Sequence, residues 1–359
     1  MQAAISVLGL SIFLTFGYPK LSFAAAPICA KSIQGSFQKD VLGDLRSSLR
    51  KASVRQCEGS CYFEAVVSPL EAKLSTHFGR SVTVSRPHLF ANLLMMRLAV
   101  LSVGGKGLFA FQESKHGITD IVSNGNVLLM SSLINNTGLR IMGPKSQAYL
   151  HKENAVMKDL YNTSGQLVYD LLHARPQKRF KTKAEAAADT SATLKASIIS
   201  FMPKLKKILE TSELSVPDAV TNFKIKPKNF DLEFEVGDQL SSALETRIIE
   251  TLSKGEELTL VYFHINSYVK KRHGRDGFLT LSDNPIEKSE AEKNKKGGSH
   301  AVAVVDVIKN MSGRIEYIVI RNSWGGQGRS DRGYHYISIK YLKHYGGSVL
   351  DWSLQFKTD

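Results

Sequence analysis

Residues 299–326 read SHAVAVVDVIKNMSGRIEYIVIRNSWGG. Two runs within this stretch, 301–308 and 315–320, are rich in β-branched residues, which favours strands. Between them stands the turn-prone tetrad 310–313, Asn-Met-Ser-Gly. Strands joined by so short a connection pair antiparallel, so the stretch predicts a β-hairpin.

The predicted hairpin brings a histidine close to an asparagine. With the two middle residues of the tetrad as the loop, Ala301 would face Asn322 and His300 would face Ser323, with a slip of one or two residues tolerated. An asparagine amide oxygen can accept a hydrogen bond from the far ring N–H of a catalytic imidazole and so fix its orientation. Trp324 follows at once and would shield that bond from water. A lone histidine at the start of a strand is commonly structural, but this pairing favours a functional one.

A separate segment, residues 56–62, supplies a candidate nucleophile. It reads QCEGSCY, and apolar residues recur at helical spacing after it. The lead-in would deliver Cys61 to the first turn of a helix, where unpaired N–H groups and the helix dipole favour the reactive thiolate. The alternatives are a structural cysteine or a redox pair of Cys57 with Cys61, whose spacing is one residue longer than C-x-x-C.

Together these segments carry a resemblance to a known family. Gly59–Tyr62, Ser299–Val302 and Arg321–Gly325 resemble the active-site blocks of papain-like cysteine peptidases, the cathepsin family, and the order cysteine, histidine, asparagine is also that family's order. The similarity covers roughly Asp44–Gly143 and Leu240–Ile339. Each block alone is a weak signal, whereas three blocks in order are specific.

The resemblance implies a role for each matched residue. Cys61 would be the nucleophile, His300 the acid and base, and Asn322 the residue that orients the histidine. The family places a glutamine that binds the oxyanion slightly upstream of the nucleophile. Gln56 lies one residue closer than expected and Arg55 occupies the formal position, so we expect Gln56 to serve after a local deletion.

Further matched residues would bind substrate. Gly104 and Gly105 resemble the glycine pair that borders the family's substrate cleft, and Trp324 belongs to the asparagine block. The family needs no metal and no organic cofactor, and its substrates are peptides or proteins. One departure is spacing, because Cys61 and His300 lie about 100 residues further apart than the roughly 130–150 of the family signature.

The implied fold is α+β with two domains and an insertion. Residues 44–145 would form a mainly helical domain that carries the nucleophile, and residues 236–359 a β-rich, antiparallel, barrel-like domain that carries the histidine and asparagine. Residues 146–235 are charge-dense with long helical periods, which predicts a helical insertion with polar linkers, outside the core. A spacer role is the simpler interpretation, and a lid that guards the site is the alternative.

The N-terminus predicts export. Residues 3–16 form a 14-residue apolar stretch, too short to span a bilayer, and small residues follow it. We therefore expect a signal peptide at 1–26, an N-terminal extension at 27–43, and a secreted or periplasmic protein. Cys29 and Cys57 would then form a disulfide or both remain free.

Composition limits the other partners. The chain has 359 residues and a formal net charge of +14, with three cysteines, too few for a disulfide scaffold or paired zinc knuckles. Its basic residues are scattered without interleaved aromatic residues, so we expect no specific nucleic-acid groove. A solvated basic face is the simplest explanation, and electrostatic contact with anionic surfaces is the alternative.

Two rival functions stay open from the sequence. The first is a thiol enzyme acting on another acyl substrate, such as an amidase or a transferase. The second is a papain-fold protein that has weak or no catalytic activity and serves as a binding module. The intact cysteine, histidine and asparagine argue against the second, whereas the displaced glutamine and the basic surface support it.

Overall fold

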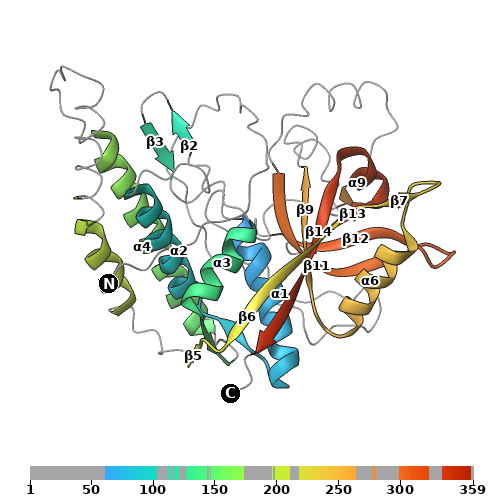
Figure 1. Ribbon diagram of the computed structural model, residues 1–359, viewed down its shortest axis with the longest axis horizontal. Coiled ribbons are helices and arrows are strands. Elements are labelled where there is room, and N and C mark those ends of the chain that lie inside the picture. Colours follow the sequence, from blue (N-terminus) through green and yellow to red (C-terminus); the bar gives the residue numbers. More distant parts are fainter. Residues whose placement is uncertain are drawn as a thin grey trace.

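The protein combines helices with a mainly antiparallel sheet, an α+β architecture (Figure 1). The structure is a computed structural model, which describes residues 61–102, 112–114, 117–120, 127–143, 145, 147–173, 196, 199–210, 218–263, 278–279, 299–322 and 334–356. The predicted signal peptide and N-terminal extension lie outside these residues. No helix within the described ranges is both long and apolar enough to cross a membrane.

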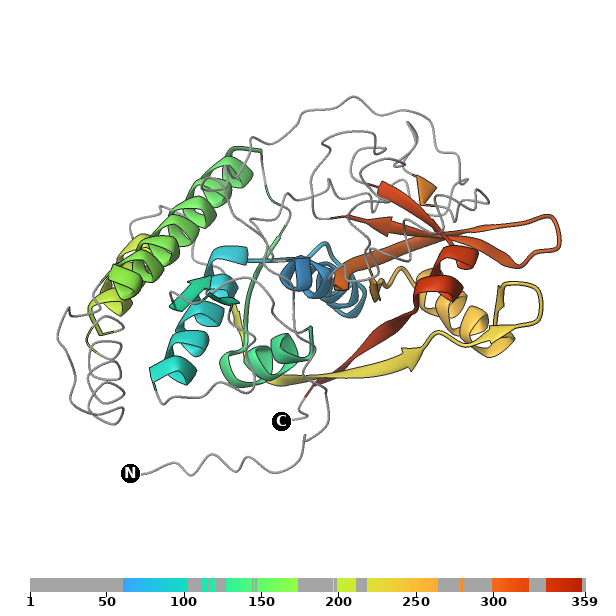
Figure 2. The same ribbon diagram turned by 90° about the horizontal axis from the view of Figure 1, so that it is seen from above.

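Helix α1 occupies the centre of the molecule and begins at the candidate nucleophile. It spans Cys61–Phe78, and the apolar residues expected on its helical stripe are buried: Phe63, Val66, Val67, Leu70 and Leu74. One side of α1 packs on the sheet through β11, and the other side faces three further helices (Figures 1 and 2). Those helices are α2 (Arg86–Ser102), α3 (Val127–Thr137) and α4 (Gln147–His173).

A seven-stranded sheet forms the other half of the molecule. Its order is β10-β13-β12-β11-β9-β14-β6, and every neighbouring pair is antiparallel except β10 with β13. The order is open at β10 and β6 among the described strands, so closure into a barrel stays a prediction. The strands span Phe223–Asp231 (β6), Leu258–Phe263 (β9), Phe278–Leu279 (β10), Ser299–Lys309 (β11), Ile315–Arg321 (β12), Tyr334–Ser338 (β13) and Gly347–Phe356 (β14).

Smaller elements complete the fold. Helices α6 (Ser242–Ser253) and α9 (Ile339–Tyr345) contact strands of the large sheet. The small sheets contain β1 (Thr83–Val84) with β4 (Leu139–Met142) and β5 (Asp218–Val220), β2 (Gln112–Ser114) with β3 (Gly117–Asp120), and β7 (Phe234–Glu235) with β8 (Gln239–Leu240).

Strand β11 is buried on both faces, which explains its nearly continuous apolar sequence. Val302 and Val304 belong to the apolar cluster shared with α6 and α9, whereas Ala303 and Val305 belong to a small cluster on the opposite face. Ala301 joins the large cluster around α1 and α2. The part of the strand that follows His300, residues 301–305, is thus packed on both faces.

The expectation for residues 146–235 is wrong in two respects. The stretch contains helix α4 and the helical residues 199–210, but it also contains β5 and β6, which pair with β4 and β14. Figure 2 shows β6 beside β14, with the beginning of β6 at α3. The stretch also lies inside the core, because Val156, Leu160, Phe201 and Leu205 are buried in the same cluster as the stripe of α1. Whether it is an insertion relative to the papain family stays a prediction.

A buried ionic cluster ties α4 to α1 and α2. Arg86 donates to Glu64 at 3.0 Å and to Glu71 at 3.1 Å, both on α1. Glu153 of α4 accepts from the backbone N–H of Arg86 at 3.3 Å and from Lys145 at 2.7 Å. These side chains are at least nine-tenths buried, so each charge depends on its partners. Helix α4 is therefore held by charge as well as by apolar packing.

Candidate active site

The first residue of α1 is Cys61, as expected, and its thiol is free and partly exposed. Burial raises the pKa of this thiol, but the charge of His300 and a hydrogen bond with its ring lower it, and the net pKa lies below the ordinary value. Backbone hydrogen bonds from Ala301 and Tyr62 lower the pKa further. The surroundings of Cys61 therefore favour the thiolate, which is the nucleophilic form.

His300 is hydrogen-bonded to Asn322, as the sequence predicts. The ring Nε2 lies 3.0 Å from Oδ1 of Asn322, and the two residues are 5% and 1% exposed. A carboxamide oxygen only accepts, so Nε2 carries the proton in this bond. The other ring nitrogen, Nδ1, is then the one left for the Cys61 sulfur. The structure thus brings together three of the predicted site residues in a chain from sulfur to imidazole to carboxamide.

The hairpin register differs from the prediction by one residue, and the difference matters for the site. Ala303, not Val302, lies opposite Arg321, so the next pair along the ladder is Val302 with Asn322. His300 and Val302 share a face because side chains alternate along a strand. In the predicted register Asn322 would face Ala301 and point away from His300. The observed register puts the imidazole and the carboxamide on one face as diagonal neighbours.

The turn explains this register. Asn310 and Arg314 form the closing backbone pair at 2.9 Å, which leaves a three-residue loop instead of two. Gly313 ends the loop with φ +80°, a conformation that glycine adopts without strain. The side chain of Asn310 accepts from the backbone N–H groups of Ser312 and Arg314, each at 3.1 Å. These bonds stabilise the wider loop, which starts the ladder one residue away from the predicted register. Two shifts along the ladder, at Ile308/Lys309 and at Val304/Asp306, cancel each other before Arg321.

Tyr262 packs directly on the histidine, although no sequence motif marks it. It lies opposite His300 on β9, and the two rings meet edge to face with centroids 5.8 Å apart. Burial raises the pKa of this phenol well above its ordinary value, and Tyr341 and Cys61 raise it further. Tyr262 therefore stays neutral and forms a fixed wall behind the imidazole. Residues 258–265 read as a strand, but the pairing that selects Tyr262 is not local in the sequence.

A buried carboxylate connects the two halves of the site. Oε2 of Glu257 accepts from Ser68 of α1 at 2.5 Å and from Nη2 of Arg321 at 2.8 Å. All three side chains are buried. Arg321 directly precedes Asn322, and Ser68 lies two turns along α1 from Cys61. Glu257 thus links the helix that carries the thiol to the strand that delivers the carboxamide, a role that no sequence pattern indicated.

The remaining predicted site residues lie outside the described part of the chain. They are Gln56 with its alternative Arg55, the glycines Gly104 and Gly105, and Trp324. The same holds for Cys29 and Cys57. Their roles and the disulfide stay predictions. Among the described residues, no group of three or more histidine, cysteine, aspartate or glutamate side chains could hold a metal ion.

Known proteins resemble this chain only distantly. No protein-family profile and no curated protein matches the chain. One matching solved structure is xylellain, a cysteine protease from Xylella fastidiosa, which is 14% identical, with 88% of this chain and 85% of that chain covered and a TM-score of 0.41. A similarity at that level is too low to establish a shared family or a shared chemistry. The function therefore has to be inferred from Cys61, His300 and Asn322 themselves.

Proposed function

We propose that the protein is a papain-like cysteine peptidase, which hydrolyses peptide bonds through a Cys61 thiolate. The observation that carries this proposal is the Cys61–His300–Asn322 chain, in which the thiol pKa is lowered by the histidine and the histidine is held by the asparagine at 3.0 Å. A buried structural cysteine would need neither partner. The order and sequence context of the three residues support the same assignment.

The reaction follows from the positions of the protons. The Cys61 thiolate attacks the peptide carbonyl carbon and forms a C–S bond, and the carbonyl oxygen takes up the negative charge. Protonated His300 donates its proton to the leaving amine as the C–N bond breaks, which leaves an acyl-enzyme. Neutral His300 then removes a proton from water, whose oxygen attacks the acyl carbon. The carboxylic acid departs, and the thiolate and imidazolium are restored.

The other residues would support these steps. Asn322 accepts from Nε2 of His300 and keeps Nδ1 directed at the sulfur. Gln56 and the backbone N–H of Cys61 would bind the oxyanion, and the loss of one such donor costs about 3–4 kcal/mol of transition-state stabilisation. Gly104, Gly105 and Trp324 would border the substrate. No step needs a metal or an organic cofactor, and the predicted signal peptide would place the enzyme outside the cytoplasm.

The proposal is tested by labelling the purified protein with an epoxide inhibitor of thiol peptidases, followed by intact mass and peptide mapping. We expect a single adduct on Cys61 that is lost in Cys61→Ala and in His300→Ala, together with cleavage of a denatured protein substrate that Cys61→Ala abolishes. A general thiol alkylator under denaturing conditions checks that the thiol is present in His300→Ala.

Two results of the labelling experiment would support the rival functions instead. A Cys61 that labels without regard to His300, or not at all, would overturn catalysis and leave a binding protein. Specific labelling without cleavage of any peptide would instead favour an amidase or a transferase that uses the same thiolate on another acyl group.

A further inference from the structure

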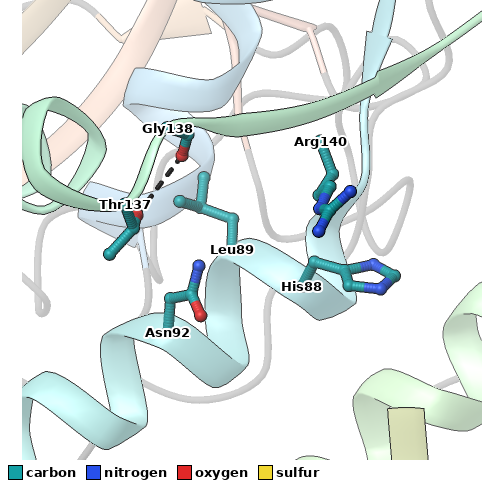
Figure 3. A pocket seen from close by; sticks show the side chains of 6 residues that line it. All are labelled: His88, Leu89, Asn92, Thr137, Gly138 and Arg140. Atoms are coloured by element: carbon teal, nitrogen blue, oxygen red, sulfur yellow. Dashed lines mark hydrogen bonds between the residues drawn. The ribbon is translucent and has the colours of Figure 1, made fainter. Parts of the chain in front are cut away.

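A cavity lies between the first turns of α2 and the junction of α3 with β4 (Figure 3). Its volume is about 280 Å³. Neither Cys61, His300 nor Asn322 lines it. The lining residues are His88, Leu89, Asn92, Thr137, Gly138 and Arg140.

Arg140 and Asn92 supply side-chain hydrogen-bond donors to this cavity. Arg140 stands on the exposed face of β4, where Leu139 and Ile141 point into the core. Within the described part of the chain, neither Arg140 nor Asn92 has a side-chain hydrogen bond or an ion pair. Of the described residues that line the cavity, none carries a carboxylate. An exposed guanidinium and a half-buried carboxamide therefore line one hollow and can donate to a ligand that enters it.

His88 adds a third polar group. Its Nδ1 lies 2.8 Å from the Ser85 hydroxyl, which leaves Nε2 for a ligand. Burial and then the positive charge of Arg140 lower the pKa of His88, while Glu153 raises it. Glu153 does not neutralise Arg140, because it is engaged by Lys145 at 2.7 Å. At neutral pH the ring is uncharged, and the charge of the cavity is that of Arg140.

We propose that this cavity binds a small oxyanion, a phosphate or a carboxylate, either free or as the end group of a larger molecule. The planar guanidinium offers two parallel N–H groups that match two oxygens of such an anion. The Asn92 amide supplies a further donor from α2. The volume lies just below the usual range of about 300–1,000 Å³ for ligand pockets, so it suits an end group and not a whole drug-sized ligand.

The test is an NMR titration of the full chain, with the histidine ring signals followed as inorganic phosphate is added. Sodium chloride keeps the ionic strength constant, and the His88 signal is identified by its loss in His88→Gln. Parallel titrations use acetate and a short phosphoserine peptide. We expect a saturable shift of the His88 signal, and we expect Arg140→Gln to weaken binding at least about tenfold, because it removes a charge-assisted hydrogen bond.

The matched control is Arg80→Gln, which removes the same charge from an exposed arginine outside the cavity. We expect it to bind as the unmodified protein does. Equal affinity for phosphate and the phosphopeptide would mean that a free ion is sufficient, and tighter binding of the peptide would indicate an end group on a larger partner. No saturable shift, or an equal loss in both arginine variants, would overturn the proposal.

Discussion

Glu257 offers the sharpest test of how the site is held together, because it is a buried carboxylate shared by α1 and β12. The substitution Glu257→Gln keeps the shape and one oxygen acceptor for Ser68, but it removes the carboxylate that pairs with the buried guanidinium of Arg321 and, among the described residues, leaves only the charge of Glu71 acting on it. Removal of one partner from a buried ion pair typically costs about 3–5 kcal/mol. Because the hydrogen bond from Ser68 is retained, we expect a loss near the lower end, about 3 kcal/mol.

The measurement is the free energy of unfolding from urea titrations, with the slope compared between variants. The control is Lys206→Gln, which breaks an exposed ion pair with Glu210 at 3.6 Å and should cost less than about 1 kcal/mol. The double variant Glu257→Gln with Arg321→Met should recover part of the loss, because no unpaired charge remains. A single-variant loss as small as that of the control would refute the inference that Arg321 is shielded from water.

Three further predictions follow from other contacts. Substitution of His300 by alanine should make Cys61 less reactive toward iodoacetamide at neutral pH than in the unmodified protein, because the charge and the hydrogen bond of His300 no longer lower the thiol pKa while burial still raises it. Alkylation rates measured against pH would show the thiolate appearing at higher pH, and an unmoved profile would contradict the interaction of Cys61 with His300. Thr259→Val should lower the free energy of unfolding in urea by about 1–3 kcal/mol, because the buried hydroxyl accepts a hydrogen bond from Nε1 of Trp352 at 2.8 Å. A loss below about 0.5 kcal/mol would mean that a water molecule replaces the hydroxyl. Gly138→Ala should lower the melting temperature, because φ is +69° and a Cβ would meet a β5 carbonyl oxygen at 2.7 Å, and an unchanged melting temperature would show that the turn yields easily.

The hairpin shows what local sequence can predict and what it misses. The two strands and the closeness of His300 to Asn322 follow from β-branched runs and a turn signal. The predicted loop length was wrong, and the residues of the loop explain why. A two-residue hairpin loop of the favoured type needs positive φ at both positions, which Met311 and Ser312 adopt poorly, whereas Gly313 accepts it one position later. A shift of one residue in the pairing of the two strands decides which face of the sheet carries Asn322.

Strand β6 was missed for a different reason. Its buried residues, Phe223 and Ile225, alternate with exposed lysines, and Pro227 interrupts the run. Charge and proline reduced the strand signal, yet both are usual on an edge strand, where they discourage pairing with another chain. The helical stripe of α1 was readable because its period is local. The contact of Glu257 with Arg321 was not, because nothing in the sequence specifies which distant strands become neighbours.

The position of β14 has a consequence for how the protein assembles. This strand follows β6 and β9 in the sequence, yet it lies between them in the sheet. Val349 packs into the cluster of α6, whereas Trp352 packs into the cluster of α1. Strand β14 therefore pairs with two strands that precede it in the chain, and it carries side chains into both apolar clusters. Among the described strands, β6 thus joins the large sheet only through residues 347–356.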